Sequence, residues 1–185
     1  DKNEYDNAKK YFIELLSFSD LDENMVLNAN FQLAYDEFKN GNLDPFNEFI
    51  DNFPESPMSQ QALLLMARFY KGSDNRVSEL AVFSRMLELY PDDPKILNAY
   101  AWRMSEMNLN LLDALDKVRH AVELAYDDED FQAGILDTEA ELLWRLGLFD
   151  EAIKTIEKSL LIDPESEYFS DQKEKFINAK KEFGN

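Results

Sequence analysis

The chain of 185 residues carries 38 acidic and 19 basic side chains, a net charge of −19, with one His and no Cys. The lack of Cys excludes disulfides, thiolate metal sites and thiol redox chemistry, and the excess of acid argues against nucleic-acid partners because phosphates would be repelled. Hydrophobic residues make up 45% of the chain, which is enough for a packed core, and the longest uncharged apolar run, 62–67, is too short for membrane insertion.

Apolar residues recur at helical spacing between 5 Gly and 6 Pro, and no run alternates in the way that strands do. This pattern predicts an all-α chain. In chain order, the predicted helices span 4–18, 23–40, 43–52, 57–71, 75–90, 94–107, 111–125, 130–146, 149–162 and 165–183.

The chain begins at Asp1, without an initiator Met or an apolar leader segment. We therefore expect it to be a processed protein or part of a longer one. Without Cys, the sequence is compatible with reducing and oxidising compartments alike, so the localisation is left open.

The predicted helices form pairs that repeat. A small residue lies midway along the first helix of successive pairs at intervals of 33, 34 and 39 residues: Ala34, Ala67, Ala101 and Ala140. In the second helix an apolar residue precedes the closing turn by eight: Phe46, Phe83, Val118 and Ile156. Periods of this length are typical of stacked helix pairs, none of which can bury its apolar face alone.

The chain resembles the tetratricopeptide-repeat family. The best copy spans 133–166, and the residues that fill the repeat pattern are Leu136, Glu139, Ala140, Leu143, Gly147, Ala152, Ile156 and Pro164. A copy at about 60–93 has Glu79 where a small residue is expected. A third copy, at about 94–126, is followed by a longer loop, 125–131.

The resemblance implies a right-handed α-solenoid of about ten helices in one continuous domain. Residues 1–56 would hold the N-terminal helices and a degenerate first repeat, and 57–166 the three recognisable repeats. Residues 167–185 would form a capping helix, because Phe169, Phe176 and Phe183 give it an apolar stripe.

Candidates for chemistry are few. His120 is the one side chain with a near-neutral ordinary pKa, and no Ser or carboxylate is placed by sequence to act with it. The acidic segments 20–24 and 127–130 lack the Gly that a calcium loop needs at its sixth position. The sequence therefore predicts a non-enzyme with no metal site and no cofactor.

The family resemblance implies that exposed positions of each first helix line a concave groove that binds a partner. These positions are Leu64, Leu65, Arg68, Asn98, Trp102, Asp137, Glu141, Trp144 and Arg145. For Trp102, packing between repeats remains an alternative to the groove. A clamp for a terminal carboxylate is disfavoured, because Asp137 and Glu141 would repel it.

We expect a non-catalytic scaffold for a protein or peptide that is neutral to basic and carries an apolar anchor. The alternative is a structural or dimerising appendage. The segments 98–102 and 135–138 and the lysine-rich last helix are similar to repeat regions that follow a thioredoxin-like domain in some bacterial proteins. The sequence leaves open whether copies of the chain associate.

Overall fold

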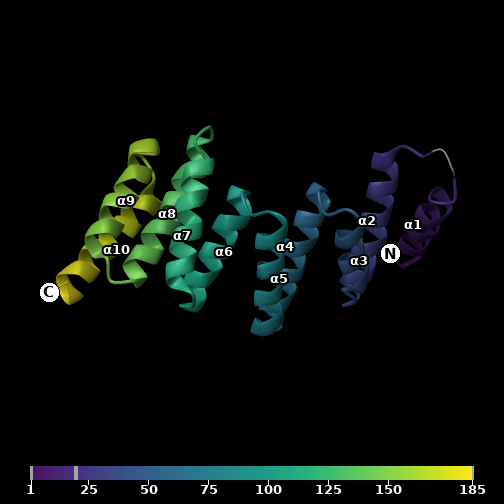
Figure 1. Ribbon diagram of the computed structural model, residues 1–185, viewed down its shortest axis with the longest axis horizontal. Coiled ribbons are helices and arrows are strands. Elements are labelled where there is room, and N and C mark those ends of the chain that lie inside the picture. The colour runs from purple at the N-terminus through teal and green to yellow at the C-terminus, as the bar shows by residue number, and fades with distance from the viewer. Residues whose placement is uncertain (1, 19–20, 185) are drawn as a thin grey trace. The chain divides into compact units, whose positions relative to one another are not determined.

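A computed structural model describes residues 2–18 and 21–184, with the side chains of 2–8 excepted. Asp20, in one of the acidic segments above, lies outside this part. The described residues form ten α-helices and no strand (Figure 1). The helices are α1 (Lys2–Leu15), α2 (Glu23–Lys39), α3 (Asp44–Asn52), α4 (Pro57–Gly72), α5 (Arg76–Leu89), α6 (Pro94–Met107), α7 (Leu111–Leu124), α8 (Glu129–Arg145), α9 (Phe149–Ile162) and α10 (Glu167–Phe183). None of the described helices is long and apolar enough to cross a membrane.

The ends of the helices are set by local chemistry. A side-chain oxygen of Asp93 accepts hydrogen bonds from the backbone N–H groups of Lys95 and Ile96 at 2.8 and 3.1 Å, and Pro94 opens α6. Ser56 caps α4 and Ser166 caps α10 in the same manner. Such caps satisfy donors that lack a partner inside the helix, and α4 and α6 begin at the predicted residues, whereas α10 begins two residues after its predicted start.

The chain divides into two compact units, Asp1–Leu89 and Tyr90–Asn185. In the first, α2 packs against α3 and α4 against α5; in the second, α6 packs against α7 and α8 against α9. Helix α10 packs against α9 (Figure 1). That the two units form one continuous domain stays a prediction.

The small residues of the repeat pattern lie where the paired helices meet. Their exposed fractions are at most 4%: Ala34, Ala67, Ala101 and Ala140. The apolar residues that precede each closing turn by eight are also buried: Phe46, Phe83, Val118 and Ile156. Each pair therefore has its own apolar core, built from the positions that the sequence repeats.

Each of these four pairs also turns through a residue with positive φ, seven residues after its small Ala. These residues are Gly41 (φ 85°), Asp74 (φ 52°), Asn108 (φ 52°) and Gly147 (φ 78°). Glycine adopts this left-handed conformation freely, and Asp and Asn tolerate it because their short polar side chains bond locally. Of these four residues, only Gly147 was part of the repeat pattern recognised in the sequence.

Two features depart from a regular repeat. Glu79 stands where the pattern places a small residue, and it is 1% exposed. In α10, only Phe176 of the predicted stripe is fully buried, whereas Phe183 is 65% exposed. The last helix therefore has one fully buried side chain, fewer than any of the paired helices α2 to α9.

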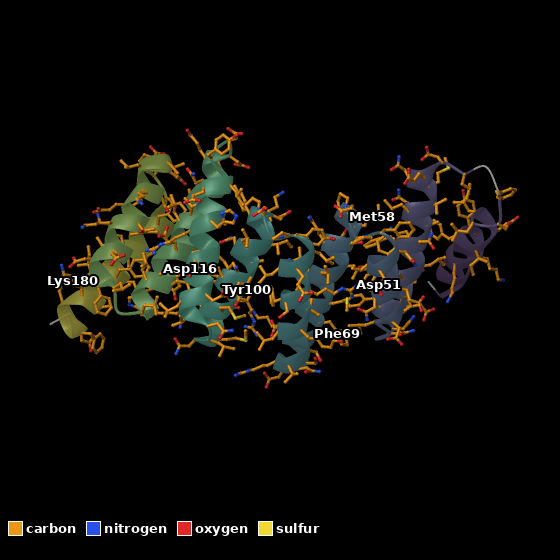
Figure 2. The ribbon with its side chains drawn as sticks, in the orientation of Figure 1. Asp51, Met58, Phe69, Tyr100, Asp116 and Lys180 are labelled. Carbon is orange, nitrogen blue, oxygen red and sulfur yellow. The ribbon has the colours of Figure 1, made fainter. Side chains whose placement is uncertain are left out.

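Polar contacts connect helices within each unit. In the first unit, Arg85 of α5 donates to Asn47 and to Asp51 of α3 at 3.0 and 2.6 Å (Asp51 is labelled in Figure 2). In the second, the hydroxyl of Tyr100 donates to Asp113 of α7 at 2.6 Å (Tyr100 is labelled in Figure 2). The pKa of Tyr100 is raised to about 12, mainly because its hydroxyl is buried and secondly because it donates a hydrogen bond to the carboxylate of Asp113.

Candidate functional site

The predicted groove residues lie on three first helices. Leu64, Leu65 and Arg68 belong to α4 in the first unit, and the others belong to α6 and α8 in the second. Their surroundings differ between the three helices.

The α4 residues lie together on one face of their helix. Leu64, Leu65 and Arg68 line a surface depression of about 280 Å³ with Pro57, Gln60 and Gln61. Positions three and four apart share one side of a helix, which explains why a single helix supplies all of these side chains. Leu64 and Leu65 are half-buried and Arg68 is exposed, so this face is open to a partner.

The α6 residues form a second open surface. Trp102 is 39% exposed, and Asn98 lies one helical turn before it and is half-buried. The side-chain oxygen Oδ1 of Asn98 is buried, and no hydrogen bond to it is found among the described residues. A large exposed ring of this kind is suited to a ligand that brings an apolar group, whereas the buried oxygen of Asn98 is closed to it.

The acidic residues of α8 are buried rather than open, and residues of α10 contact them. Asp137 is 7% exposed and Glu141 is 6% exposed. Oδ2 of Asp137 accepts a hydrogen bond of 2.9 Å from the hydroxyl of Tyr168 in α10. Its other oxygen, Oδ1, is buried and has no hydrogen-bond partner in the described part of the chain.

Burial raises the pKa of Asp137. The hydrogen bond from Tyr168 opposes this shift, the nearby charge of Glu141 adds to it, and the ammonium group of Lys175 opposes it again. Burial of the Tyr168 hydroxyl, followed by the nearby charge of Asp137, raises the pKa of Tyr168. A carboxyl group whose charge is disfavoured in this way is poorly suited to attract a distant cation.

Glu141 is fully engaged inside the chain. One of its oxygens accepts from Nε and Nη2 of Arg145 at 2.9 Å, and the other accepts from Nζ of Lys175. Both cations also lie over the ring of Trp144, with Nζ of Lys175 at 4.5 Å and the guanidinium carbon of Arg145 at 5.4 Å from its centre. The ring of Phe176 is 6.2 Å from that of Trp144.

The structure thus brings Asp137, Glu141, Trp144 and Arg145 together, but at a surface that α10 occupies. Their binding to an external partner stays a prediction. The residues that complete this cluster, Tyr168, Lys175 and Phe176, were not predicted as site residues. The apolar stripe of the last helix was the available signal for Phe176.

His120 lies on the surface of the second unit. Its Nε2 is 2.8 Å from a carboxylate oxygen of Asp92, and its Nδ1 is 3.8 Å from Glu123. Its side chain is 42% exposed. Surface pairs of this kind contribute little to stability, and this one does not adjoin the groove residues by any described contact.

Comparison with known proteins supports the repeat assignment. Residues 133–166 match the family described as Tetratricopeptide repeat. The crystal structure of PilW, a widely conserved type IV pilus biogenesis factor, resembles the chain with a TM-score of 0.58 at 15% sequence identity. The likeness covers 85% of this chain and 80% of that one. No curated protein sequence matches the chain.

These matches confirm the predicted all-α fold of tetratricopeptide-type helix pairs and the copy at 133–166. Repeats of this kind typically serve as non-catalytic scaffolds that bind proteins or peptides, so the chain has the fold of an interaction scaffold. The bounds of the copies at 60–93 and 94–126 stay predictions. The likeness to regions that follow a thioredoxin-like domain is not shown by these matches.

Proposed function

We propose that this chain is a non-catalytic scaffold that binds a protein or peptide on the groove side of its first helices. The observation that carries the proposal is Trp102, a ring that is 39% exposed on α6. Exposed aromatic rings are the side chains that most often anchor protein interfaces. The open face of α4 offers a further surface of mixed apolar and cationic character.

The expected partner is neutral to basic and carries an apolar anchor. A net charge of −19 repels acidic chains and speeds the approach of basic ones. The anchor would pack on Trp102, whose ring is exposed on α6. We assign this role to the α6 surface first, because the carboxylates of α8 are already bonded within the chain.

Site-specific crosslinking tests the proposal. A photoreactive amino acid replaces Trp102 in one variant and Leu161 in a control. Leu161 is 81% exposed but lies on α9, a second helix. A crosslinked protein from host extract is then purified and titrated against Trp102→Ala and Leu161→Ala.

Loss of an anchoring Trp should weaken binding by about 2 kcal/mol or more, whereas Leu161→Ala should change it by less than about 0.5 kcal/mol. Equal affinity for both variants, or a strongly acidic partner, would contradict the proposal. No crosslink above that of the control would do the same.

A further inference from the structure

Helix α10 contacts its neighbours through one fully buried aromatic ring and several charged side chains. Of its 17 residues, all of them described, only Phe176 is buried. Three lysines form ion pairs with preceding helices: Lys173 with Glu157, Lys175 with Glu141, and Lys180 with Asp150 (Lys180 is labelled in Figure 2). A segment with few buried apolar contacts opens at lower free energy than a core helix, and ion pairs weaken in salt.

The face of α8 beneath it contains the chemistry expected of a binding site. Trp144 offers a ring, and Glu141 and Asp137 offer carboxylates. Helix α10 supplies the complementary groups: an ammonium group, from Lys175, next in sequence to an aromatic ring, from Phe176. The partner features expected from charge and exposed aromatics, a cation beside an apolar anchor, are thus present in the chain's own last helix.

We propose that α10 is a displaceable occupant of this α8 surface, and that the external ligand which replaces it is an amphipathic helix with a Lys or Arg adjacent to a large apolar residue. This inference rests on the proposed function, since it names a partner chemistry and a means of regulation for the same set of helices. While α10 is attached, the α8 surface is closed, and ligands reach only the open surfaces.

Competition within one chain has a quantitative consequence. When the open state is a small fraction of the population, the apparent affinity for an external ligand is its intrinsic affinity multiplied by that fraction. A change that loosens α10 but leaves α8 intact should therefore strengthen the binding of an external helix. A helix that only caps the fold would not give this result.

The probe is a fluorescein-labelled synthetic peptide with the sequence of residues 167–183, and its binding to the full chain is followed by fluorescence anisotropy. Lys175→Gln in the full chain removes the ammonium group from Glu141 and Trp144 and should make the peptide bind about tenfold more tightly, the effect of losing a charged hydrogen bond. The matched control is Lys181→Gln, on the same helix and with the same loss of charge. Lys181 is exposed and forms no ion pair in the described part of the chain, so this variant should bind like the unchanged chain.

A peptide in which the residue equivalent to Phe176 is Ala should bind at least tenfold more weakly to the Lys175→Gln chain. Equal binding to Lys175→Gln and Lys181→Gln, or no binding of the peptide to either, would overturn the proposal. Binding that Trp102→Ala leaves unchanged would support it, because Trp102 belongs to α6 and not to the α8 residues that α10 contacts. Loss of peptide binding in Trp102→Ala would place the peptide on α6 and overturn it.

Hydrogen exchange of the unaltered chain gives a second, independent measurement. The amides of α10 should exchange faster than those of α8 and α9, and the difference should grow as salt rises from about 0.05 to about 0.5 M. Exchange of α10 together with α8 and α9, at the same rate in both salts, would show that the helix does not open separately. That outcome would overturn the displacement of α10 and leave the α6 proposal standing.

Discussion

The hydroxyl of Tyr168 donates a hydrogen bond of 2.9 Å to one carboxylate oxygen of Asp137, while the other oxygen of that carboxylate is buried without a hydrogen-bond partner among the described residues. A single donor does not replace the hydration that an ionised carboxylate loses on burial. The pKa of Asp137 is therefore raised, because burial disfavours the charged form of the carboxyl group more than the one hydrogen bond favours it. As a consequence, the contribution of Asp137 to stability decreases as pH rises, whereas an acid with a lowered pKa contributes less as pH falls.

Because the pKa of Asp137 is higher in the folded chain than in the unfolded one, its contribution to stability is fully present below the unfolded pKa of about 3.9. That contribution is lost as pH rises through the folded pKa. We therefore expect Asp137→Asn to be at least as stable as the unchanged chain at pH 7, and to lose this advantage near pH 3.5. Urea unfolding at both pH values measures it.

Asp150→Asn is the control of opposite sign. A hydrogen bond from Lys180 lowers the pKa of Asp150, so that the contribution of Asp150 is present at neutral pH and is lost as pH falls through its folded pKa. This variant should be less stable than the unchanged chain at pH 7 and no less stable in acid. The same pH trend in both variants would contradict the role given to burial at Asp137.

Ala101→Leu and Ala140→Leu should each destabilise the fold by about 1–3 kcal/mol, because both alanines are 0% exposed and a larger side chain forces the paired helices apart. Ala81→Leu introduces the same side chain at an exposed position of α5 and should change stability by less than about 0.5 kcal/mol. Chemical unfolding gives all three values. Unchanged midpoints in the two buried variants would refute the repeat register.

Gly147→Ala and Gly134→Ala should have opposite effects. No atom lies within 4 Å of a Cβ added at either position, so only the backbone decides. Gly147 has φ 78°, where Ala costs about 1–2 kcal/mol. Gly134 lies inside α8, where Ala should stabilise by about 0.5–1 kcal/mol. Chemical unfolding measures both changes. If the two variants change the free energy of unfolding in the same direction, the turn does not require a residue that adopts the left-handed conformation freely.

His120→Ala should leave any activity of the chain unchanged and alter its stability by less than about 1 kcal/mol, because its pairs with Asp92 and Glu123 are solvent-exposed. A metal chelator such as EDTA should not shift the melting temperature. Calorimetry with and without chelator tests both statements. A chelator-induced loss of several degrees would reveal a bound metal that the acidic segments hold.

The sequence was sufficient for the helices because their determinants are local. The starts of α4 and α6 follow from Ser56 and Asp93 before a proline, and the inward positions follow from the spacing of Ala101 and Ala140. The left-handed turn residues Asp74 and Asn108 were not predicted, since these residue types adopt other conformations far more often. Their constant distance of seven residues from the small Ala was the signal that could have identified them.

The environment of Asp137 and Glu141 could not be predicted in the same way. Helical spacing shows which residues share a face, but it does not show which element covers that face. The pattern of charges indicated complementary groups, because Lys175 adjoins Phe176 in the last helix and the segment of α8 has two acids one turn apart. Only the three-dimensional arrangement shows that these groups meet each other.

The described polar contacts between helices of the same unit all join residues that are close in sequence. The separation is 38 residues for Arg85 and Asn47, 34 for Lys175 and Glu141, and 26 for the buried bond from Ser159 to the carbonyl of Ala133. None of these contacts requires the two ends of the chain to be brought together, and the entropy cost of closing a loop grows only slowly with its length. Each of these contacts can therefore form once the neighbouring helices that it joins have been synthesised, without the remainder of the chain.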